Sequence, residues 1–146
     1  MMKNFPILSK KLCRDLTSAI HDTFNREVCG FLIEEENELR FRRMENLGGY
    51  GEFILDEVMV KLFCDNAGKN GIKVRYFVHN HFTGLELSSS DINSFCRNDW
   101  PWLIVMIKND KISGKWYWHE KNSIHSQDLI TEVTQNSFIL DEPRRP

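Results

Sequence analysis

Two histidines and an aspartate have the spacing of a metal site. His79 and His81 stand at the end of an apolar run, residues 74–78, and Asp91 follows ten residues after His81. Because residues i and i+2 of a strand face the same side, both imidazoles can point at one ion. Two histidines and a carboxylate suit zinc, and three protein ligands leave a fourth position for water, as in catalytic zinc sites. The pattern therefore favours a metal site over the alternative, in which the histidines lie in a turn and Asp91 only caps a helix.

A zinc hydrolase also needs a general base beside its water. Glu27 is the best upstream candidate, because it directly precedes the apolar run 28–33, which is typical of a buried strand. Gly30 within that run lets another backbone approach closely. The residues alone leave one alternative open, in which Glu27 is a solvated side chain at a helix–strand turn.

Three enzyme motifs with similar residues do not fit this chain. His79-Asn80-His81 is not the HNH nuclease motif, whose residues are dispersed through a ββα hairpin. An amidohydrolase needs a barrel of about 250 residues, whereas this chain has 146. The helical His-Glu-x-x-His of common zinc proteases is absent from the sequence.

Alternating helices and strands must position these residues. Ser9 is expected to cap a first helix, and Asp56 a second one that ends near Gly68. A third, short helix is expected to begin at Asp91. The apolar stripe of the second helix is expected at Val58, Met59, Leu62 and Phe63. Strands are expected at 28–33, 39–44, 74–78, 102–107 and around 116–118.

This order of elements predicts one α/β (α+β) domain with a mixed, largely antiparallel sheet. Turns are expected at Glu34-Glu35-Glu36-Asn37 and at Asn109-Asp110. The chain becomes more polar after residue 118, where an edge strand is expected near residues 126–133, followed by a disordered end.

Composition narrows the classes of partner. The 19 basic and 21 acidic side chains give a net charge of −2, which argues against nucleic acid and anionic membranes as partners. No apolar run approaches the roughly 20 residues of a membrane helix, and the N-terminus lacks a signal peptide, so a cytoplasmic protein is expected. The cysteines are expected to be buried hydrophobes, because no Cys-x-x-Cys pair occurs among Cys13, Cys29, Cys64 and Cys96.

The motifs together resemble a known family. Arg26-Glu27-Val28-Cys29-Gly30-Phe31-Leu32, then Val78-His79-Asn80-His81, then Ser88-Ser89-Ser90-Asp91 are similar to the JAMM (MPN+, JAB) zinc metallopeptidases, whose pattern is an upstream Glu, His-x-His, a loop and Ser-x-x-Asp. The similarity spans roughly residues 8–118 and is to the compact prokaryotic branch, which also has an Asn-containing loop after the second strand, here at Asn46, and a strand like Trp102 to Val105.

The resemblance implies roles for individual residues. His79, His81 and Asp91 would bind one zinc ion per chain, Glu27 would take a proton from the water that zinc activates, and Ser88 would stabilise the oxyanion. The implied fold is a single JAB/MPN domain over residues 1–118, a curved mixed sheet flanked by helices and similar to that of cytidine deaminases. Residues 119–146 would form the polar C-terminal extension.

Two departures from the family pattern lie in one loop. The residue after His81 is usually proline but here is Phe82, and the loop to Ser88 holds six residues where seven are usual. A shortened loop could shift Ser88 or transfer its role to Ser89.

The resemblance also implies a substrate. The expected activity is that of a deubiquitinase-like isopeptidase or peptidase, which cleaves the amide bond after the C-terminus of a ubiquitin-like protein in a precursor or conjugate. Expected partners include activating and conjugating enzymes from the same operon. Gly49, Tyr50 and Phe82 are candidates for contacting the substrate. The alternatives are a peptidase of phage-tail assembly and a catalytically inactive binding scaffold.

Overall fold

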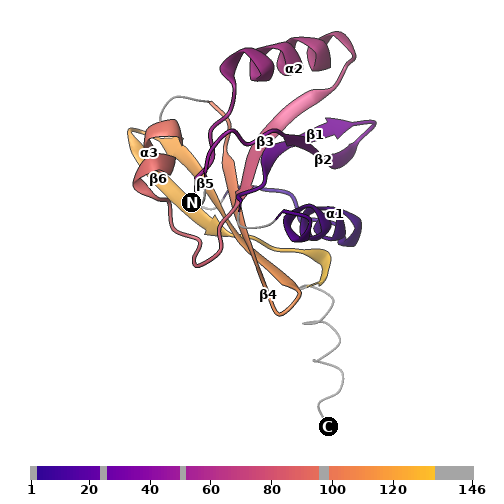
Figure 1. Ribbon diagram of the computed structural model, residues 1–146. Helices are drawn as coiled ribbons and strands as arrows, with labels where there is room; N and C mark the ends of the chain where they lie inside the picture. The colour runs from indigo at the N-terminus through magenta and orange to yellow at the C-terminus, as the bar shows by residue number, and fades with distance from the viewer. Residues whose placement is uncertain (1–2, 24–25, 50–51, 96–98, 134–146) are drawn as a thin grey trace.

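The computed structural model describes residues 3–23, 26–49, 52–95 and 99–133, which form three helices and six strands (Figure 1). The elements, in chain order, are α1 (Lys10–His21), β1 (Cys29–Glu35), β2 (Glu38–Met44), α2 (Glu57–Lys69), β3 (Lys73–Asn80), α3 (Ser89–Phe95), β4 (Trp102–Lys108), β5 (Lys111–Glu120) and β6 (Ser123–Asp128).

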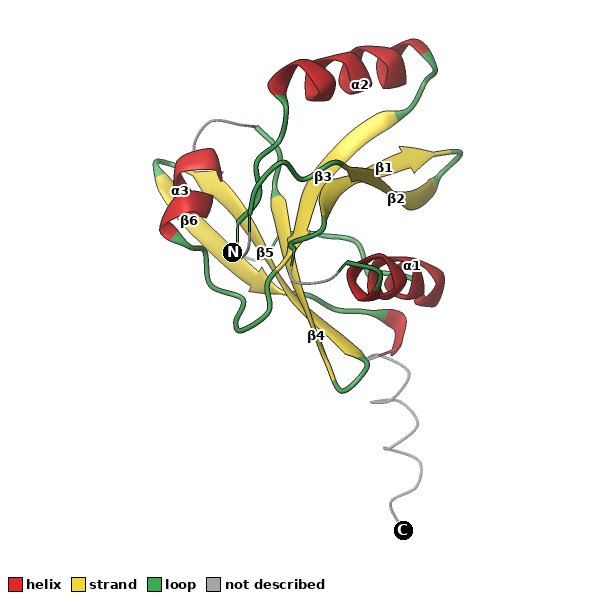
Figure 2. Cartoon of the chain, in the orientation of Figure 1, coloured by secondary structure: helices red, strands yellow, loops and turns green. Residues whose placement is uncertain are grey.

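All six strands belong to one mixed sheet, in the order β2-β1-β3-β4-β5-β6. Only β3 and β4 run parallel, and every other neighbouring pair is antiparallel. A parallel pair cannot be joined by a tight turn, so the chain leaves the end of β3 and returns to β4 through a loop and α3 (Figure 2). The expected α+β domain with a largely antiparallel mixed sheet is confirmed.

The sheet has a hydrophobic core on each face. Side chains alternate between the faces along β3, so Val78 packs in the cluster that includes Leu12 and Leu16 of α1. Phe77 packs in the opposite cluster, with Phe95 of α3 and with residues of α2. Figure 1 shows the β1–β2 hairpin between α1 and α2. Phe77 and the next odd-numbered residue, His79, therefore face the layer that contains α3.

Local signals place the starts of α1 and α2 and two hairpin turns where the sequence predicts them. The third helix begins at Ser89 rather than at Asp91, because Ser88 is the residue that caps it. The Ser9 hydroxyl accepts a hydrogen bond from the Leu12 amide (3.1 Å), and the Asp56 carboxylate accepts one from Val58 (2.9 Å). The turn Glu36-Asn37 has positive φ at both residues, and so does Asn109-Asp110, as two-residue hairpins of type I′ require.

The buried face of α2 differs from the expected one. Three residues of the expected stripe, Val58, Met59 and Leu62, are more than half exposed. The fourth, Phe63, does pack against the core, together with Val60 and Ala67. Both faces of this helix carry apolar residues, so periodicity could not distinguish the side that packs on the sheet. No helix of the described residues is long and apolar enough to span a membrane.

The edge strand after β5 also differs from expectation. β6 spans Ser123–Asp128 rather than residues near 126–133, because a third positive-φ pair, Lys121-Asn122, turns the chain directly after β5. Thr131 forms an isolated bridge to Leu8 instead of continuing the strand. Residues 134–146, for which a disordered end was expected, lie outside the described part of the chain.

Gly30 permits the close approach of β1 and β2. A Cβ at this position would lie 2.9 Å from the Arg43 Cα and would also meet the Arg42 carbonyl. Both contacts are to backbone, so a methyl group could be accommodated only by separating the two strands.

We expect Gly30→Ala to lower the free energy of unfolding by about 1–3 kcal/mol, as overpacking does. Gly68→Ala is the matched control, since no atom lies within 4 Å of its added Cβ and the residue is helical. The control should gain about 0.5–1 kcal/mol from its lower chain entropy. Urea unfolding of both variants measures the two shifts, and a Gly30→Ala protein as stable as the parent would contradict the steric argument.

Candidate metal centre

His79 and His81 bring their imidazoles together at the end of β3. They face the layer of α3 because they share the parity of Phe77 along the strand. Their Nε2 atoms lie 3.2 Å apart. The His81 amide donates to the Val105 carbonyl (2.9 Å), so β4 holds this residue after the pairing of β3 with β1 has ended. The predicted pairing of the two histidines is thus present.

Asp91 reaches both histidines from the first turn of α3. Its Oδ1 lies 3.2 Å from the Nε2 of His79, and its Oδ2 lies 2.9 Å from the Nε2 of His81. Ser88 and Asp91 cap the helix reciprocally: the Ser88 amide donates to Oδ2 (2.9 Å) and the Asp91 amide donates to the Ser88 hydroxyl oxygen (3.0 Å). The cap therefore fixes the carboxylate against the imidazoles.

The second ring nitrogens of the two histidines differ in their surroundings. Nδ1 of His81 lies 2.9 Å from the Gly84 carbonyl. Since a carbonyl only accepts, this nitrogen carries a proton, and Nε2 is the atom directed at Asp91. Nδ1 of His79 is buried without a hydrogen-bond partner in the described residues, and the His79 ring packs against Phe53 and Trp102.

Burial lowers the pKa of each imidazole, whereas the Asp91 carboxylate raises it. Burial lowers the pKa of the fully enclosed His79. Burial also opposes the charging of His81, but its hydrogen bond to Asp91 and the charges of Asp91 and Glu27 raise the pKa of this residue overall. The pKa of Asp91 is lowered despite burial, because both histidines and the Ser88 amide bond to it. The buried carboxylates on either side of His81 therefore favour its charged form.

Glu27 is the second buried carboxylate of the site. It precedes β1 and is only 5% exposed, so the alternative of a solvated side chain is wrong. Its Oε1 has no hydrogen-bond partner among the described residues and lies 4.0 Å from the Nε2 of His79. Burial, and then the nearby charges of Asp91 and Glu52, raise the pKa of Glu27 to about 7 although His81 opposes the shift.

These residues fit a bound metal ion. Ligand atoms of Glu27, His79 and His81 lie within 4.8 Å of one another, and a buried group of this kind can hold a metal such as zinc. The ligand atoms around a tetrahedral zinc, at about 2.0–2.1 Å from the ion, are separated by about 3.3 Å. The separations among the two Nε2 atoms and the oxygens of Asp91, 2.9–3.2 Å, approach that value.

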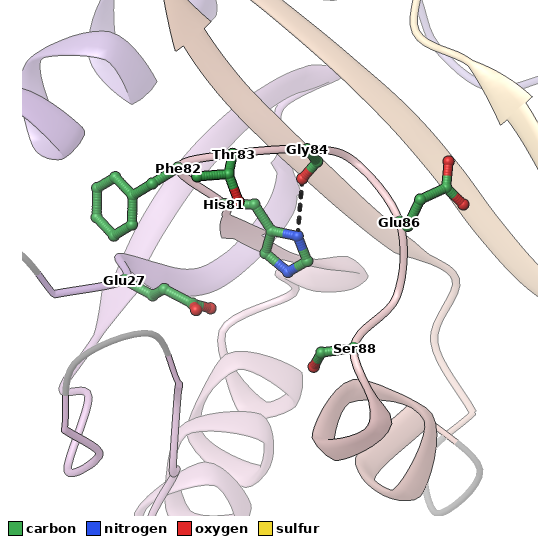
Figure 3. Close-up of a pocket in the computed structure, with 7 residues that line it drawn as sticks. All are labelled: Glu27, His81, Phe82, Thr83, Gly84, Glu86 and Ser88. Atoms are coloured by element: carbon green, nitrogen blue, oxygen red, sulfur yellow. Dashed lines mark hydrogen bonds between the residues drawn. The ribbon is translucent and has the colours of Figure 1, made fainter.

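A cavity of about 380 Å³ opens onto the site. Figure 3 shows the Glu27 carboxylate and the Ser88 hydroxyl on either side of the His81 ring. The loop that follows His81 forms the far wall of the cavity, with Phe82, Thr83, Gly84 and Glu86.

The three residues expected to contact the substrate differ in their position relative to the cavity. Phe82 lines the cavity, Gly49 does not, and Tyr50 lies outside the described residues. Ser88 lines the cavity and Ser89 does not, so the shorter loop leaves Ser88 beside the site.

Tyr117 supports this loop and was not identified from the sequence. Its hydroxyl donates to the Leu85 carbonyl (2.7 Å), next to the carbonyl that holds His81. An aromatic residue in a β-strand is typical of a core position, and no sequence signal reveals that its hydroxyl reaches a distant loop.

The three cysteines among the described residues take no part in the site. Cys13 and Cys29 are buried free thiols, and Cys64 is a partly buried free thiol. Burial, followed by the charge of Glu27, raises the pKa of Cys29 to about 12, so its thiol stays protonated. Cys96 lies outside the described residues.

Neither protein-family models nor curated proteins match the chain by sequence. Solved structures do match its fold. A solution structure of a protein from Desulfitobacterium hafniense has a TM-score of 0.71 at 19% identity, covering 86% of this chain and 92% of that one. A solution structure of a protein from Salinibacter ruber has a TM-score of 0.54 at 15% identity, covering 86% and 91%.

A third similar structure carries a descriptive name. The crystal structure of a JAB1/MPN domain protein from Archaeoglobus fulgidus has a TM-score of 0.50 at 18% identity, and the match covers 86% of this chain and 98% of that one. The predicted fold is therefore confirmed: the chain has the α+β fold of a JAB/MPN domain, with a mixed six-stranded sheet.

The raised pKa of Glu27 predicts a pH-dependent effect on stability. The group titrates near 4.5 when unfolded and near 7 when folded. The folded state therefore binds more protons between these values, and its stability falls as pH rises from 4.5 to 7. In protein treated with a chelator, Glu27→Gln should raise the free energy of unfolding by about 1–3 kcal/mol at pH 8 and by little at pH 4.5.

Urea unfolding at the two pH values measures this difference. Glu45→Gln is the control, because removing this exposed charge should change the free energy of unfolding little relative to the parent at either pH. Equal stabilities of Glu27→Gln and the parent at pH 8 would show that the buried charge costs nothing.

Proposed function

We propose that this protein is a zinc-dependent metallopeptidase that hydrolyses an amide bond. One observation carries the proposal: two imidazole Nε2 atoms and the Asp91 carboxylate converge within 3.2 Å, beside the buried Glu27, at the wall of an open cavity. A metal site, a general base and access for a substrate are the parts that such a hydrolase needs.

His79, His81 and Asp91 are the proposed zinc ligands. Asp91 is favoured over Glu27 as the third ligand because its oxygens lie 2.9–3.2 Å from the imidazole nitrogens, whereas the nearest Glu27 oxygen is 4.0 Å from His79. When bound, zinc would lower the pKa of a water molecule and polarise the carbonyl of the scissile amide.

Glu27 is the proposed general base. Its pKa of about 7 and its unpartnered Oε1 suit a group that accepts a proton near neutral pH. The carboxylate would take the proton of the attacking water as the water oxygen bonds to the carbonyl carbon. It would then give that proton to the amide nitrogen as the carbon–nitrogen bond breaks, which releases an amine.

Ser88 is the proposed oxyanion donor. The Asp91 amide occupies a lone pair of its hydroxyl oxygen (3.0 Å), which leaves the hydroxyl proton free to be donated. The hydroxyl borders the cavity next to His81 (Figure 3). A donor held there would stabilise the carbonyl oxygen as it gains negative charge.

We further propose that the scissile amide follows the C-terminus of a ubiquitin-like modifier, in a precursor or in a conjugate. The similarity of the Glu27, His79-Asn80-His81 and Ser88-to-Asp91 motifs to the JAMM pattern supports this substrate. The small cavity, walled by Phe82 and Thr83, fits a narrow peptide tail better than a folded substrate. Activating and conjugating enzymes from the same operon would be its functional partners.

The metal and the base can be tested together. Purified protein should contain about one zinc per chain, and His79→Ala should lose it, whereas His21→Ala on the surface should not. Glu27→Gln should keep the zinc but lose about 10²- to 10⁴-fold in turnover. The probe is a peptide that ends in Gly-Gly joined through an amide to a fluorogenic amine. Failure of the zinc-loaded parent to cleave this peptide or a modifier fusion would refute the enzyme.

Ser88 can be tested against its neighbour. Ser88→Ala should lower kcat by about 10²- to 10³-fold with little change in KM, as the loss of an oxyanion donor does, and should cost about 1 kcal/mol of stability through the lost cap. Ser89→Ala is the control, since this exposed residue does not line the cavity. A larger loss of kcat in Ser89→Ala would transfer the role to Ser89.

A further inference from the structure

We propose that Asn46 and Asn80 are positioning residues that together hold Glu27 beside the metal site. Their side-chain amides bind opposite ends of a single peptide group, the one that joins Glu27 to Val28. The catalytic part of this inference rests on the proposed function, whereas the structural part does not.

Asn80 holds the N–H end of that peptide group. Its Oδ1 accepts a hydrogen bond from the Val28 amide (2.6 Å), and its own amide donates to the Val28 carbonyl (3.1 Å). Cys29–His79 is the last pair of the β1–β3 ladder, so Val28 and Asn80 occupy the next positions. In a regular antiparallel pair the second bond would go to the backbone carbonyl. The Asn80 side chain takes its place.

Because the Asn80 side chain replaces the backbone carbonyl, the chain can switch from bonding with the β1 side to bonding with β4 between the two histidines. Asn80 stays bonded to the segment before β1, while the amide of the next residue, His81, already bonds to β4. Asn80 is 2% exposed and its neighbours in sequence are both proposed ligands. The same short segment therefore positions the imidazoles and, through one hydrogen bond, the backbone next to the base.

Asn46 holds the C=O end of the same peptide group. Its Nδ2 donates to the Glu27 carbonyl (2.8 Å) and to the Glu52 carbonyl (3.0 Å). Its Oδ1 accepts from the amides of Gly48 (2.7 Å) and Ile54 (3.0 Å). Two acceptors and two donors surround the side chain, so it has a single orientation that satisfies them all. This residue ties Glu27 to the loop between β2 and α2.

A clamp on the backbone matters because one oxygen of the carboxylate has no hydrogen bond to hold it. Oε1 of Glu27 has no hydrogen-bond partner in the described part of the chain, so that oxygen contributes nothing to orienting the side chain. With both ends of this peptide group bonded, a shift of the Glu27 Cα would strain or break one of the two hydrogen bonds. Misplacement of a catalytic group by about 1 Å can cost on the order of 10²-fold in rate.

The first experiment measures turnover in two backgrounds. Asn46→Ala and Asn80→Ala should each lower kcat on the fluorogenic Gly-Gly amide at least about ten-fold, with zinc content unchanged. In a Glu27→Gln background, neither substitution should lower the residual rate further, because the residue through which they act is gone. Asn70→Ala is the matched control, an exposed amide at the end of α2 that bonds within the helix. An equal loss in both backgrounds, or no loss, would overturn the proposal.

One chemical change should act oppositely at the two positions. Asn80 uses only its acceptor oxygen toward Val28, so Asn80→Asp keeps the bond and should retain more of the rate than Asn80→Ala. Asn46 uses its donors toward Glu27, so Asn46→Asp places a carboxylate against the Glu27 carbonyl and should be at least as impaired as Asn46→Ala. The reverse order at either position would contradict the assigned bonds.

The second experiment needs no substrate. Hydrogen exchange of the Val28 amide should accelerate at least about ten-fold in Asn80→Ala and remain slow in Asn70→Ala, and ¹⁵N relaxation should show greater motion at Val28 in both clamp variants. Should the parent hydrolyse nothing, the proposed function fails while Val28 still reports on the clamp. Unchanged exchange and relaxation in folded variants would refute the clamp itself.

Discussion

The structure depends on the burial of two carboxylates against one pair of imidazoles. Glu27 and Asp91 are each 5% exposed or less, and the charge of Asp91 helps to raise the pKa of Glu27. Two like charges buried close together are stable only if positive charge lies between them or if one of them binds a proton. Without an ion, the raised pKa values of His81 and Glu27 favour the proton binding that would supply this compensation. A divalent cation would supply more positive charge than these protons do, so the two buried carboxylates favour binding of such an ion.

The sheet supplies the frame that makes this arrangement possible. β3 carries both imidazoles, its antiparallel neighbour β1 brings Glu27 alongside, and the crossover to the parallel strand β4 places α3 over the same end. Two strand pairings and one helix therefore converge at the carboxyl end of β3. Short polar links complete the frame: the Ser88–Asp91 cap, the His81–Gly84 bond and the two asparagine bonds to the Glu27–Val28 peptide group.

The elements that local chemistry specifies were predictable. Ser9 and Asp56 cap helices because a side-chain oxygen reaches a backbone amide two or three residues away, and Asn109-Asp110 turns because these residues tolerate positive φ. The buried face of α2 was not predictable from its pattern, because apolar residues occupy both faces and the sheet selects between them. The start of β6 was mislocated although Asn122 offered a turn signal of the same kind.

The candidate site likewise has features that follow from local sequence and features that only the packing of separate elements creates. The sequence by itself determined that His79 and His81 share a face, since the two-residue period of a strand is a local property. The cap that Ser88 and Asp91 form across three residues is also local, but the expected helix start at Asp91 missed it. Only the tertiary structure decided that Glu27, 52 residues before His79 in sequence, is buried 4.0 Å from its ring. It likewise decided that Asn46 and Asn80 meet at one peptide group and that Tyr117 supports the loop. The reason is physical: these contacts are made by side chains from separate elements, and strand pairing and helix packing, not local spacing, bring those elements together.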